Sequence, residues 1–534
     1  MIRDLLAASL RAALLADGIE PPATISVERP ARPEHGDWSS NVALALAATT
    51  RRPPRELATV IAGRLSADPP QYVAEVTVAG PGFVNFRLDH SWLHDVLRQV
   101  VEGGVEGYAR PDLGAGRSVN VEFVSANPTG PLHVGGGRWA AYGDSLCRIM
   151  ERSGYRVHRE YYVNDRGNQI RMFLESIAAA RAGLPTPENG YRGGYITEWA
   201  AEMPAEADAR EWGEGRVLAD LRTTLERMNV RFDTWFSERS MVASGAIDAA
   251  LADLTARGAT IEADGAVWLK ATDFGLAKDE VLVKSGGDPT YLLSDIAYHR
   301  DKFERGFDRL IDVWGADHHG HVARLQVAMQ ALGHDPDDLE IVLGQLVTIL
   351  REGELVRMGK RSGEFVELAE VLDEVGPDVA RLTFLLQSID TRQTFDLATV
   401  VSKSMDNPVH YVQYAHARIA SIARVAGERA IERLPLEKVD LGLLVHPREL
   451  DVLRSLAELP DVVAEACSTR APHKVATWVR ELAGRFHGFH HDCYVMGQGV
   501  SAELTQARLW LVESARVGLA VGLDLLGVSA PEAM

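Results

Sequence analysis

The pattern of apolar and polar positions between residues 119 and 150 predicts a strand, a break and then a helix. Val119, Val121, Phe123 and Val124 form a short apolar run suited to a buried strand. The sequence Asn-Pro-Thr-Gly-Pro at 127–131 then excludes regular structure. Beyond it, side chains at helical spacing predict a helix with one apolar face: Tyr142, Leu146, Ile149 and Met150.

The junction between the predicted strand and helix carries His133 and three consecutive glycines, Gly135, Gly136 and Gly137. A helix start offers unpaired N–H groups and a positive dipole end to an anion, and glycine lets a ligand come close. This junction is therefore a candidate phosphate site. Taken alone, the glycines are equally compatible with a flexible loop.

Apolar patterning along the whole chain indicates three domains. Residues 1–108 begin with an amphipathic helix and continue with two strands, 72–78 and 83–86, which predicts a small α/β domain. Residues 109–394 alternate strands and helices, as in a Rossmann-like domain with a parallel sheet. Residues 395–534 repeat apolar positions at helical intervals, which predicts a C-terminal helical bundle.

Two further strands of the central domain are expected at 156–163 and 309–314. Residues from about 190 to 280 interrupt the alternation of strands and helices, which predicts an insertion. Open parallel sheets bind ligands at the carboxyl ends of their strands. The segments 122–133 and 317–321 are therefore expected to lie at the same ligand site.

The length and charge of the chain limit the possible functions only slightly. A chain of 534 residues is too long for one hydrophobic core, so several domains are expected. Lys and Arg total 56 and Asp and Glu total 75, which gives a formal net charge of −19. This charge argues mildly against a nucleic-acid partner, although it says little about one local patch.

The cysteines and the first residues of the chain indicate the cellular compartment in which the protein is expected. Cys147, Cys467 and Cys493 are scattered and form no C-x-x-C pair, which argues for a reducing compartment and against a structural zinc site. The first residues place charges at helical intervals, unlike a signal peptide or a membrane anchor. We therefore expect a cytoplasmic protein with no membrane partner.

Several segments carry signatures of one enzyme family. Residues 131–135 read Pro-Leu-His-Val-Gly, and residues 122–131 read Glu-Phe-Val-Ser-Ala-Asn-Pro-Thr-Gly-Pro. The first segment is similar to the nucleotide-binding signature of class I aminoacyl-tRNA synthetases, and the two together resemble arginyl-tRNA synthetase. The resemblance covers the whole length, because it continues in further segments: GPGFVNF from Gly80, YYVNDRGNQI from Tyr161, VWGADHHG from Val313, DNPVHYVQYAHAR from Asp406 and GVSAPEAM from Gly527.

The resemblance implies a two-step reaction. The carboxylate of L-arginine attacks the α-phosphorus of ATP, and the arginyl group then passes to the terminal ribose hydroxyl of tRNA(Arg), giving AMP and pyrophosphate. Neither step needs a covalent enzyme nucleophile, so positioning and stabilisation of phosphate charge are expected to carry catalysis. Mg²⁺ is expected to be held mainly by the ATP phosphates, and the protein is expected to be a monomer.

The first nucleotide motif implies an ATP seat at His133, Gly135 and Gly136, with His133 donating to a phosphate oxygen. The usual family pattern ends in a second histidine where this chain has Gly136. Losing one transition-state hydrogen bond typically costs about 3 kcal/mol. Either a neighbour such as Arg138 compensates, or the seat is built differently.

The second nucleotide motif is expected at residues 357–360. The family's Lys-Met-Ser-Lys is matched here by Arg-Met-Gly-Lys, with Gly359 in place of the serine. The resemblance implies that Arg357 and Lys360 neutralise phosphate charge during catalysis and that Met358 and Lys360 contact ATP. The pattern alone is also that of a solvated basic hairpin.

Two clusters resemble metal sites. The first contains Asp317, His318, His319 and His321, which the resemblance places against the ribose and adenine of ATP. The second runs from His487 to Cys493 in the predicted helical bundle. Zinc needs convergent ligands, so we expect no zinc at either cluster.

Arginine recognition requires carboxylates, because a planar guanidinium pairs bidentately with them. The resemblance implies that Tyr291 and Asp295 contact the side chain of arginine, and that Glu122, Ser125 and Asn127 bind its α-amino and nearby groups. Tyr291 and Asp295 are four residues apart, so one helix face can present both. Without the resemblance, Asp295 is an ordinary surface charge.

The tRNA contacts implied by the resemblance fall in both terminal domains. Phe83 and Asn85 carry over as a stacking face and a base-edge reader for the tRNA elbow, while Tyr411, Tyr414 and Arg418 present aromatic and cationic groups to the anticodon loop. From the residues alone, Phe83 is at least as well explained as core, and the helical set as a packing face.

Two other functions compete with an arginyl-tRNA synthetase. One is a tRNA-binding paralogue without catalysis, suggested by the departures at Gly136 and Gly359. The other is a nucleotidyltransferase of the same fold acting on a small molecule, which leaves both terminal domains unexplained. Retention of His133, Lys360 and Asp295 favours the synthetase.

Overall fold

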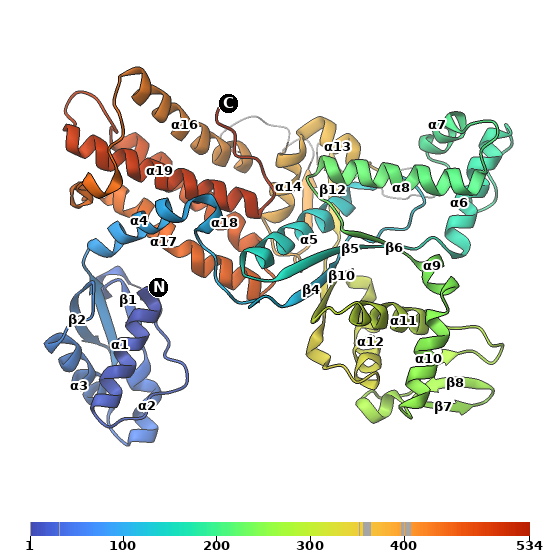
Figure 1. Ribbon diagram of the computed structural model, residues 1–534, viewed down its shortest axis with the longest axis horizontal. Helices are drawn as coiled ribbons and strands as arrows, with labels where there is room; N and C mark the ends of the chain where they lie inside the picture. The colour runs from blue at the N-terminus through green and yellow to red at the C-terminus, as the bar shows by residue number, and fades with distance from the viewer. Residues whose placement is uncertain (1, 31, 352, 356–364, 397–399, 401–406) are drawn as a thin grey trace. The chain divides into compact units, whose positions relative to one another are not determined.

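The computed structural model describes residues 2–30, 32–351, 353–355, 365–396, 400 and 407–534 (Figure 1). The chain forms two compact units. The first consists of Met1–Val101, Arg433–Ala457 and Val495–Leu511, and the second of Glu102–Glu432, Glu458–Tyr494 and Val512–Met534.

The N-terminal part of the first unit is a three-stranded antiparallel sheet with helices, as predicted for a small α/β domain. The sheet has the order β1-β3-β2. Leu6 and Leu10 of the first helix are fully buried, as are Val84 and Phe86 of the central strand. The elements are α1 (Ile2–Ala16), β1 (Trp38–Ser40), α2 (Val42–Thr50), α3 (Pro54–Ala67), β2 (Val73–Ala79), β3 (Phe83–Leu88) and α4 (Ser91–Gly107), whose residues from Glu102 onward belong to the second unit.

The second unit is organised around a five-stranded parallel sheet of order β11-β10-β4-β5-β6, which confirms the predicted Rossmann-like class. The strands expected at 156–163 and 309–314 are present. The five strands are β4 (Ser118–Glu122), β5 (Arg156–Val163), β6 (Thr234–Ser237), β10 (Arg309–Gly315) and β11 (Leu339–Gly344).

The segment expected to be an insertion, about 190–280, is divided by a strand of the central sheet. Strand β6 pairs in parallel with β5, so the sheet passes through this segment. Helices precede β6, and helices with a small antiparallel sheet of order β7-β8-β9 follow it. The flanking elements are α6 (Gly167–Arg181), α7 (Gly194–Glu202), α8 (Ala209–Arg227), α9 (Glu238–Ala243), α10 (Ala246–Ala256), β7 (Thr260–Ala263), β8 (Ala266–Leu269) and β9 (Glu280–Val283).

Helices cover both faces of the central sheet (Figure 1). Successive side chains of a strand point to opposite faces. The apolar Val119 and Val121 of β4 face α5 (Val134–Arg152), whereas Asn120 and Glu122 face α11 (Tyr291–Glu304). Helix α12 (His319–Ala331) packs beside α11. Strand β4 is therefore apolar on one face and polar on the other.

The remainder of the second unit is mainly helical. It includes a three-stranded sheet of order β13-β12-β14. The long helices after residue 407 confirm the predicted helical bundle. These elements are β12 (Val347–Arg351), β13 (Glu354–Leu355), α13 (Leu368–Val375), α14 (Pro377–Leu385), β14 (Gln393–Asp396), α16 (Pro408–Glu428), α17 (Pro447–Ser468), α18 (His473–Asp492) and α19 (Ala502–Leu525), of which α17 and α19 run through both units. Among the described residues, no helix combines the length and apolar character needed to cross a bilayer.

A fully buried arginine ties α14 to α5. The guanidinium of Arg381 lies 2.6 Å from the carboxylate of Asp144 and donates to the carbonyl oxygens of Met228 and Leu526. Removing one partner of a buried ion pair leaves the remaining polar groups desolvated without compensation.

We expect Arg381→Met to lower the free energy of unfolding by about 3–5 kcal/mol, since it removes every one of these hydrogen bonds. Chemical denaturation followed by circular dichroism measures the change. Arg171→Met is the control, because Arg171 pairs with Glu175 on an exposed helix face and such pairs contribute about 0.5 kcal/mol. A loss below about 1 kcal/mol for Arg381→Met would contradict the assignment.

Candidate functional site

A cavity of about 950 Å³ opens at the carboxyl ends of β4, β5 and β10, where ligands of parallel sheets bind. It is lined from the loop after β4, the start of α5, the end of β5 and the face of α11. The lining residues include Glu122, Ser125, Asn127, Thr129, Leu132, His133, Gly136, Trp139, Tyr162, Asn164, Gln169, Asp295, Tyr298, His299, Trp314, His318 and His321.

The loop after β4 is held in an unusual conformation. Val124 and Ser125 have φ angles of 68° and 37°, and left-handed backbone is rare for a β-branched residue such as valine. The turn directs the Ser125 hydroxyl to donate to Glu122 Oε1 at 2.9 Å and to accept from the Tyr162 amide at 3.0 Å. Asn127 donates to Gln169 at 2.9 Å. The loop is thus fastened to β4, β5 and α6.

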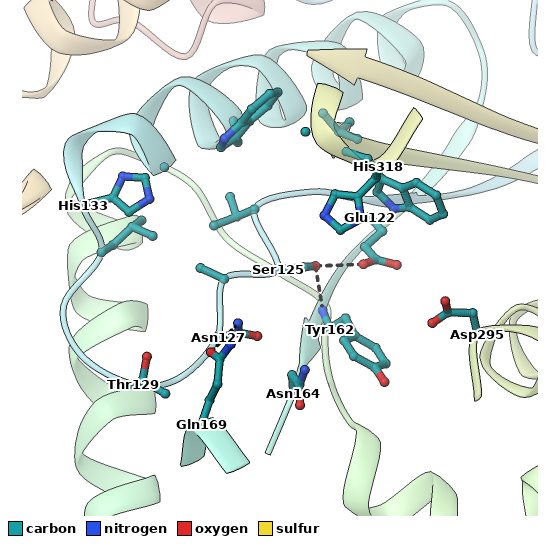
Figure 2. A pocket seen from close by; sticks show the side chains of 18 of the residues that line it. Glu122, Ser125, Asn127, Thr129, His133, Tyr162, Asn164, Gln169, Asp295 and His318 are labelled. Atoms are coloured by element: carbon teal, nitrogen blue, oxygen red, sulfur yellow. Dashed lines mark hydrogen bonds between the residues drawn. The ribbon is translucent and has the colours of Figure 1, made fainter. Parts of the chain in front are cut away.

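His133 occupies the N-cap position of α5, with extended backbone, so its side chain stands at the positive end of a 19-residue helix dipole. A Cβ on Gly135 would lie 2.9 Å from the imidazole. Glycine at 135 therefore leaves the space that the ring occupies. In Figure 2, His133 and Asp295 lie at opposite sides of the labelled residues, with Ser125 between them.

Gly136 fits its site through the absence of a side chain. A Cβ there would lie 2.6 Å from Cδ1 of Leu132, which is 1% exposed. Arg138 is buried and donates to the carbonyl oxygens of Gln345 and Ser388. Compensation by Arg138 for the missing histidine is therefore wrong, because its guanidinium is already committed to these carbonyls, and a differently built seat remains.

Asp295 stands on α11 at the other side of the cavity. Its carboxylate accepts from His321 Nε2 at 2.7 Å, and α11 confirms that Tyr291 and Asp295 share one helix. Tyr291 is 87% exposed and lines a second cavity, of about 1350 Å³. Both cavities share five lining residues: Tyr162, Asn164, Gln169, Asp295 and His321.

Glu238, at the start of α9, adds a carboxylate to the second cavity. Its pKa is raised by burial, and the nearby Asp295 adds to this rise while Arg166 opposes it. Asp295 and Glu238 thus place two acids close enough to interact near the shared wall. A cationic group between them relieves their repulsion.

The expected adenine wall is only partly at the cavity. His318 lines it and lies beside the ring of Trp314, at 6.0 Å between centroids. Asp317 is 78% exposed and is not among the lining residues. The motif Arg357, Met358 and Lys360 falls outside the described residues.

None of the expected tRNA contacts is among the residues that line the cavity. In the first unit, Phe83 is 38% exposed on β3, whereas Asn85 on the same strand is 3% exposed. In the second unit, Tyr414 is 36% exposed, and the guanidinium of Arg418 lies 4.5 Å from its ring centroid. Tyr411 packs against His487 at 4.7 Å between centroids. The exposed pair of Tyr414 and Arg418 offers a stacking surface.

The second cluster that resembles a metal site, from His487 to Cys493, is part of this helical region. His487 Nε2 bonds the Tyr411 carbonyl at 3.1 Å, and His491 pairs with Asp492 at 2.7 Å. Within the described ranges, no group of three or more His, Cys, Asp or Glu side chains converges as a metal site.

Comparisons with known protein families agree with this architecture. Residues 1–88 match the model of the arginyl tRNA synthetase N terminal domain, residues 100–182 and 206–395 match that of the catalytic domain of class I (R) tRNA synthetases, and residues 412–534 match the DALR anticodon binding domain. The fold and the site therefore define a class I aminoacyl-tRNA synthetase.

Individual relatives narrow this class. The arginine–tRNA ligase of Frankia alni is 48% identical over 97% of both chains, and that of Carboxydothermus hydrogenoformans is 44% identical over 99% of this chain and 98% of its own. The arginyl-tRNA synthetase structure of Thermus thermophilus matches all of both chains with a TM-score of 0.78 at 25% identity. The chain belongs to the arginyl-tRNA synthetase family. The predicted family, fold class and arginine–tRNA ligase activity are thereby confirmed.

Three residues near the cavity are not singled out by the sequence pattern: Tyr162, Glu238 and Lys302. Tyr162 lies in a segment that resembles the family, whereas His321 is expected from the sequence only as a member of the cluster that begins at Asp317. Glu238 and Lys302 follow no motif, since both belong to helices rich in charge. Only the fold brings them to the carboxyl ends of the strands.

Gly136→Ala tests the close packing at the start of α5. Alanine favours a helix, but its methyl group overlaps Leu132, so we expect a net loss of about 1–3 kcal/mol in the free energy of unfolding. Gly215→Ala is the matched control, because nothing lies within 4 Å of a Cβ at this exposed position of α8 and stabilisation of about 0.5–1 kcal/mol is expected. Equal effects of the two substitutions, measured by chemical denaturation, would contradict the packing argument.

Proposed function

We propose that this cavity activates arginine and transfers it to tRNA(Arg), with the nucleotide at the His133 side and arginine at the Asp295 side. The observation that carries this proposal is the gathering of a helix N-terminus, His133, and the acids Glu122 and Asp295 around one cavity. A cavity of about 950 Å³ is large enough for an aminoacyl adenylate.

In the first step, a carboxylate oxygen of arginine attacks the α-phosphorus of ATP while the bond to pyrophosphate breaks. The dipole of α5 and a hydrogen bond donated by His133 stabilise the negative charge that develops on the phosphate oxygens. Gly135 and Gly136 allow the phosphates to approach the helix start. Mg²⁺ prefers hard oxygen ligands, and we propose that it enters with ATP, neutralising its phosphates.

Arginine is held by charge. We propose that Asp295, oriented by His321, and Tyr291 contact the guanidinium, and that Glu238 faces it from α9. Near the carboxylate of arginine that reacts with ATP, we propose that three polar residues bind the α-amino and nearby groups: Glu122 at the end of β4, and Ser125 and Asn127 in the loop that follows.

In the second step, the terminal ribose hydroxyl of tRNA(Arg) attacks the arginyl carbonyl carbon and AMP leaves. Phe83, Asn85, Tyr411, Tyr414 and Arg418 remain our proposed tRNA contacts. His318 and Asp317 remain proposed for the nucleoside, and Arg357, Met358 and Lys360 for the phosphates.

We further propose the domain boundaries 1–108, 109–394 and 395–534, a monomeric state, a cytoplasmic location and the absence of a structural zinc ion. These follow from the sequence pattern and from the scattered cysteines, which are all buried.

The activity is tested with the purified protein, ATP, labelled arginine and total tRNA, by measuring acid-precipitable arginine. Accumulation that depends on both ATP and tRNA is expected. Binding of tRNA without any accumulation would instead support a paralogue that lacks catalysis.

Asp295→Asn keeps the shape of the side chain but removes its charge. We expect the KM for arginine to rise by about 10-fold to 100-fold, because a hydrogen bond to a charged group is lost, while the KM for ATP stays the same. Asp248→Asn on the exposed face of α10 is the control. An unchanged arginine KM in Asp295→Asn would place the guanidinium elsewhere.

His133→Ala is expected to lower kcat by about 100-fold to 1000-fold, since one donor to the transition state is removed. His133→Asn keeps a donor and a favourable N-cap residue, so it should recover part of the loss. Steady-state aminoacylation at saturating substrates measures both. If His133→Ala turned over at the wild-type rate, His133 would have no catalytic role.

A further inference from the structure

Three carboxylates form a row across the central sheet. Asp312 of β10 is in register with Glu122 of β4, and Glu122 is in register with Glu160 of β5. Side chains in register on neighbouring strands point to the same face. All three residues are at most 6% exposed. Adjacent like charges repel, so this row requires cations.

Helix α11 supplies a cation to the centre of the row. The ammonium of Lys302, which is fully buried, donates to Glu122 Oε2 at 2.7 Å and to Asp312 Oδ1 at 2.9 Å. It also lies 4.3 Å from the ring centroid of Tyr298. Lys302 therefore sits between two acids from neighbouring strands.

Two more side chains contact the row. His299 places both ring nitrogens against oxygen atoms, Nε2 at 2.5 Å from the Asp312 carboxylate and Nδ1 at 2.7 Å from the carbonyl of Asp295. Arg305 pairs with Glu160 at 2.7 and 2.8 Å. Lys302 and Arg305 thus place two cations against the three acids.

Glu122 is the one acid of the row that lines the cavity, where its Oε1 accepts from Ser125. Lys302 lies behind it and is not among the lining residues. The ammonium reaches the ligand side only through the carboxylate of Glu122. Lys302 cannot contact arginine itself.

We propose that Lys302 is a positioning residue for arginine binding, which keeps Glu122 ionised and aimed at the α-amino group of arginine. The inference rests on the proposed arginine site. Asp312, which His299 also contacts, holds Lys302 in place, and Ser125 donates to the other oxygen of Glu122.

The protonation of Glu122 responds to this arrangement. Burial raises the pKa of Glu122, Lys302 opposes the rise, and Asp312 adds to it. Binding of a cationic amino group needs the carboxylate, so affinity falls as the pH drops through this raised pKa. The titratable and charged groups around Glu122 come from four elements: Lys302, His299, Tyr298 and Asp295 of α11, Asp312 of β10, Tyr162 and Glu160 of β5, and His321 of α12.

A plot of kcat/KM for arginine against pH should fall on its acidic side, where Glu122 becomes protonated, and we call this fall the acid limb. Two substitutions are expected to move the acid limb in opposite directions. Lys302→Met removes the cation, so the fall in kcat/KM for arginine should begin about one pH unit higher, with an arginine KM at least about tenfold higher at neutral pH. Asp312→Asn removes the acid that raises the Glu122 pKa, so the limb should move to lower pH. The measurement is kcat/KM for arginine between about pH 5.5 and 8.5, with circular dichroism melting curves at each pH.

Lys474→Met is the matched control, because Lys474 forms an ion pair with Glu465 on α17, away from the cavity. It should leave the limb unmoved. If the two substitutions only disturbed packing, the acid limb would stay at the wild-type pH in both variants, or kcat would fall in both. Either result would overturn the positioning role of Lys302. If Lys302→Met does not fold, the direction of the Asp312→Asn shift decides alone.

Glu122→Gln separates this inference from the site assignment. If Glu122→Gln raises the arginine KM and the two network variants leave the limb unmoved, the arginine site stands and the positioning role of Lys302 is wrong. If Glu122→Gln leaves the arginine KM unchanged, the assignment of Glu122 to arginine fails first.

Discussion

The ammonium of Lys302 joins two strands and a helix at the point where the cavity begins. Like-charged side chains at neighbouring positions of a sheet are unfavourable, yet Asp312, Glu122 and Glu160 stand side by side. Helix α11 resolves the conflict because His299 and Lys302, three residues apart, share one helix face. The same helix carries Asp295 one turn earlier. The charge balance of the sheet therefore fixes the element that presents the proposed guanidinium ligand.

The polar face of β4 also explains the division of the sheet into two environments. Val119 and Val121 pack on the α5 side, where Phe123 meets the backbone of Gly143; a Cβ there would lie 2.2 Å from the Phe123 ring. On the α11 side the same strand buries charge. One strand thus sets the position of the α5 N-terminus on one face and of Asp295 on the other. Both ends of the cavity therefore depend on the alternation of apolar and polar side chains along the five residues of β4.

Local patterning was sufficient to predict the parts of the site that are near in sequence. The strand at β4, the break at 127–131 and the helix from Val134 follow from apolar spacing and from proline and glycine. Several residues expected from the family motifs, Glu122, Asn127 and His133 among them, line one cavity, whereas Asp317 and Tyr291 do not line it. The family resemblance was needed for Asp295, which by itself reads as a surface charge.

Sequence patterns could not predict the contacts that cross long separations. Lys302 meets Glu122 across 180 residues, and on an amphipathic helix a lysine is normally solvated. Glu160 reads as the polar position of an alternating strand, and nothing local indicates that Arg305 neutralises it. For Arg138 the sequence suggests a contact that is not formed, because a cation beside a phosphate motif is expected to contact the ligand. The structure buries it against backbone carbonyls instead.

Stability alone does not account for the buried network. Replacing a buried ion cluster by apolar side chains of similar volume is often neutral or stabilising, because desolvation of the charges offsets their attraction. A sheet that only had to pack against α11 would be served equally well by apolar residues at 122, 160 and 312. Lys302 and Arg305 are not among the residues that line the cavity, however, and Glu122 is the one acid of the row that does line it. An arrangement of this kind presents one oriented negative charge to a ligand and withholds the positive charges, which suits a cationic amino acid and disfavours an anionic one at that point of the cavity.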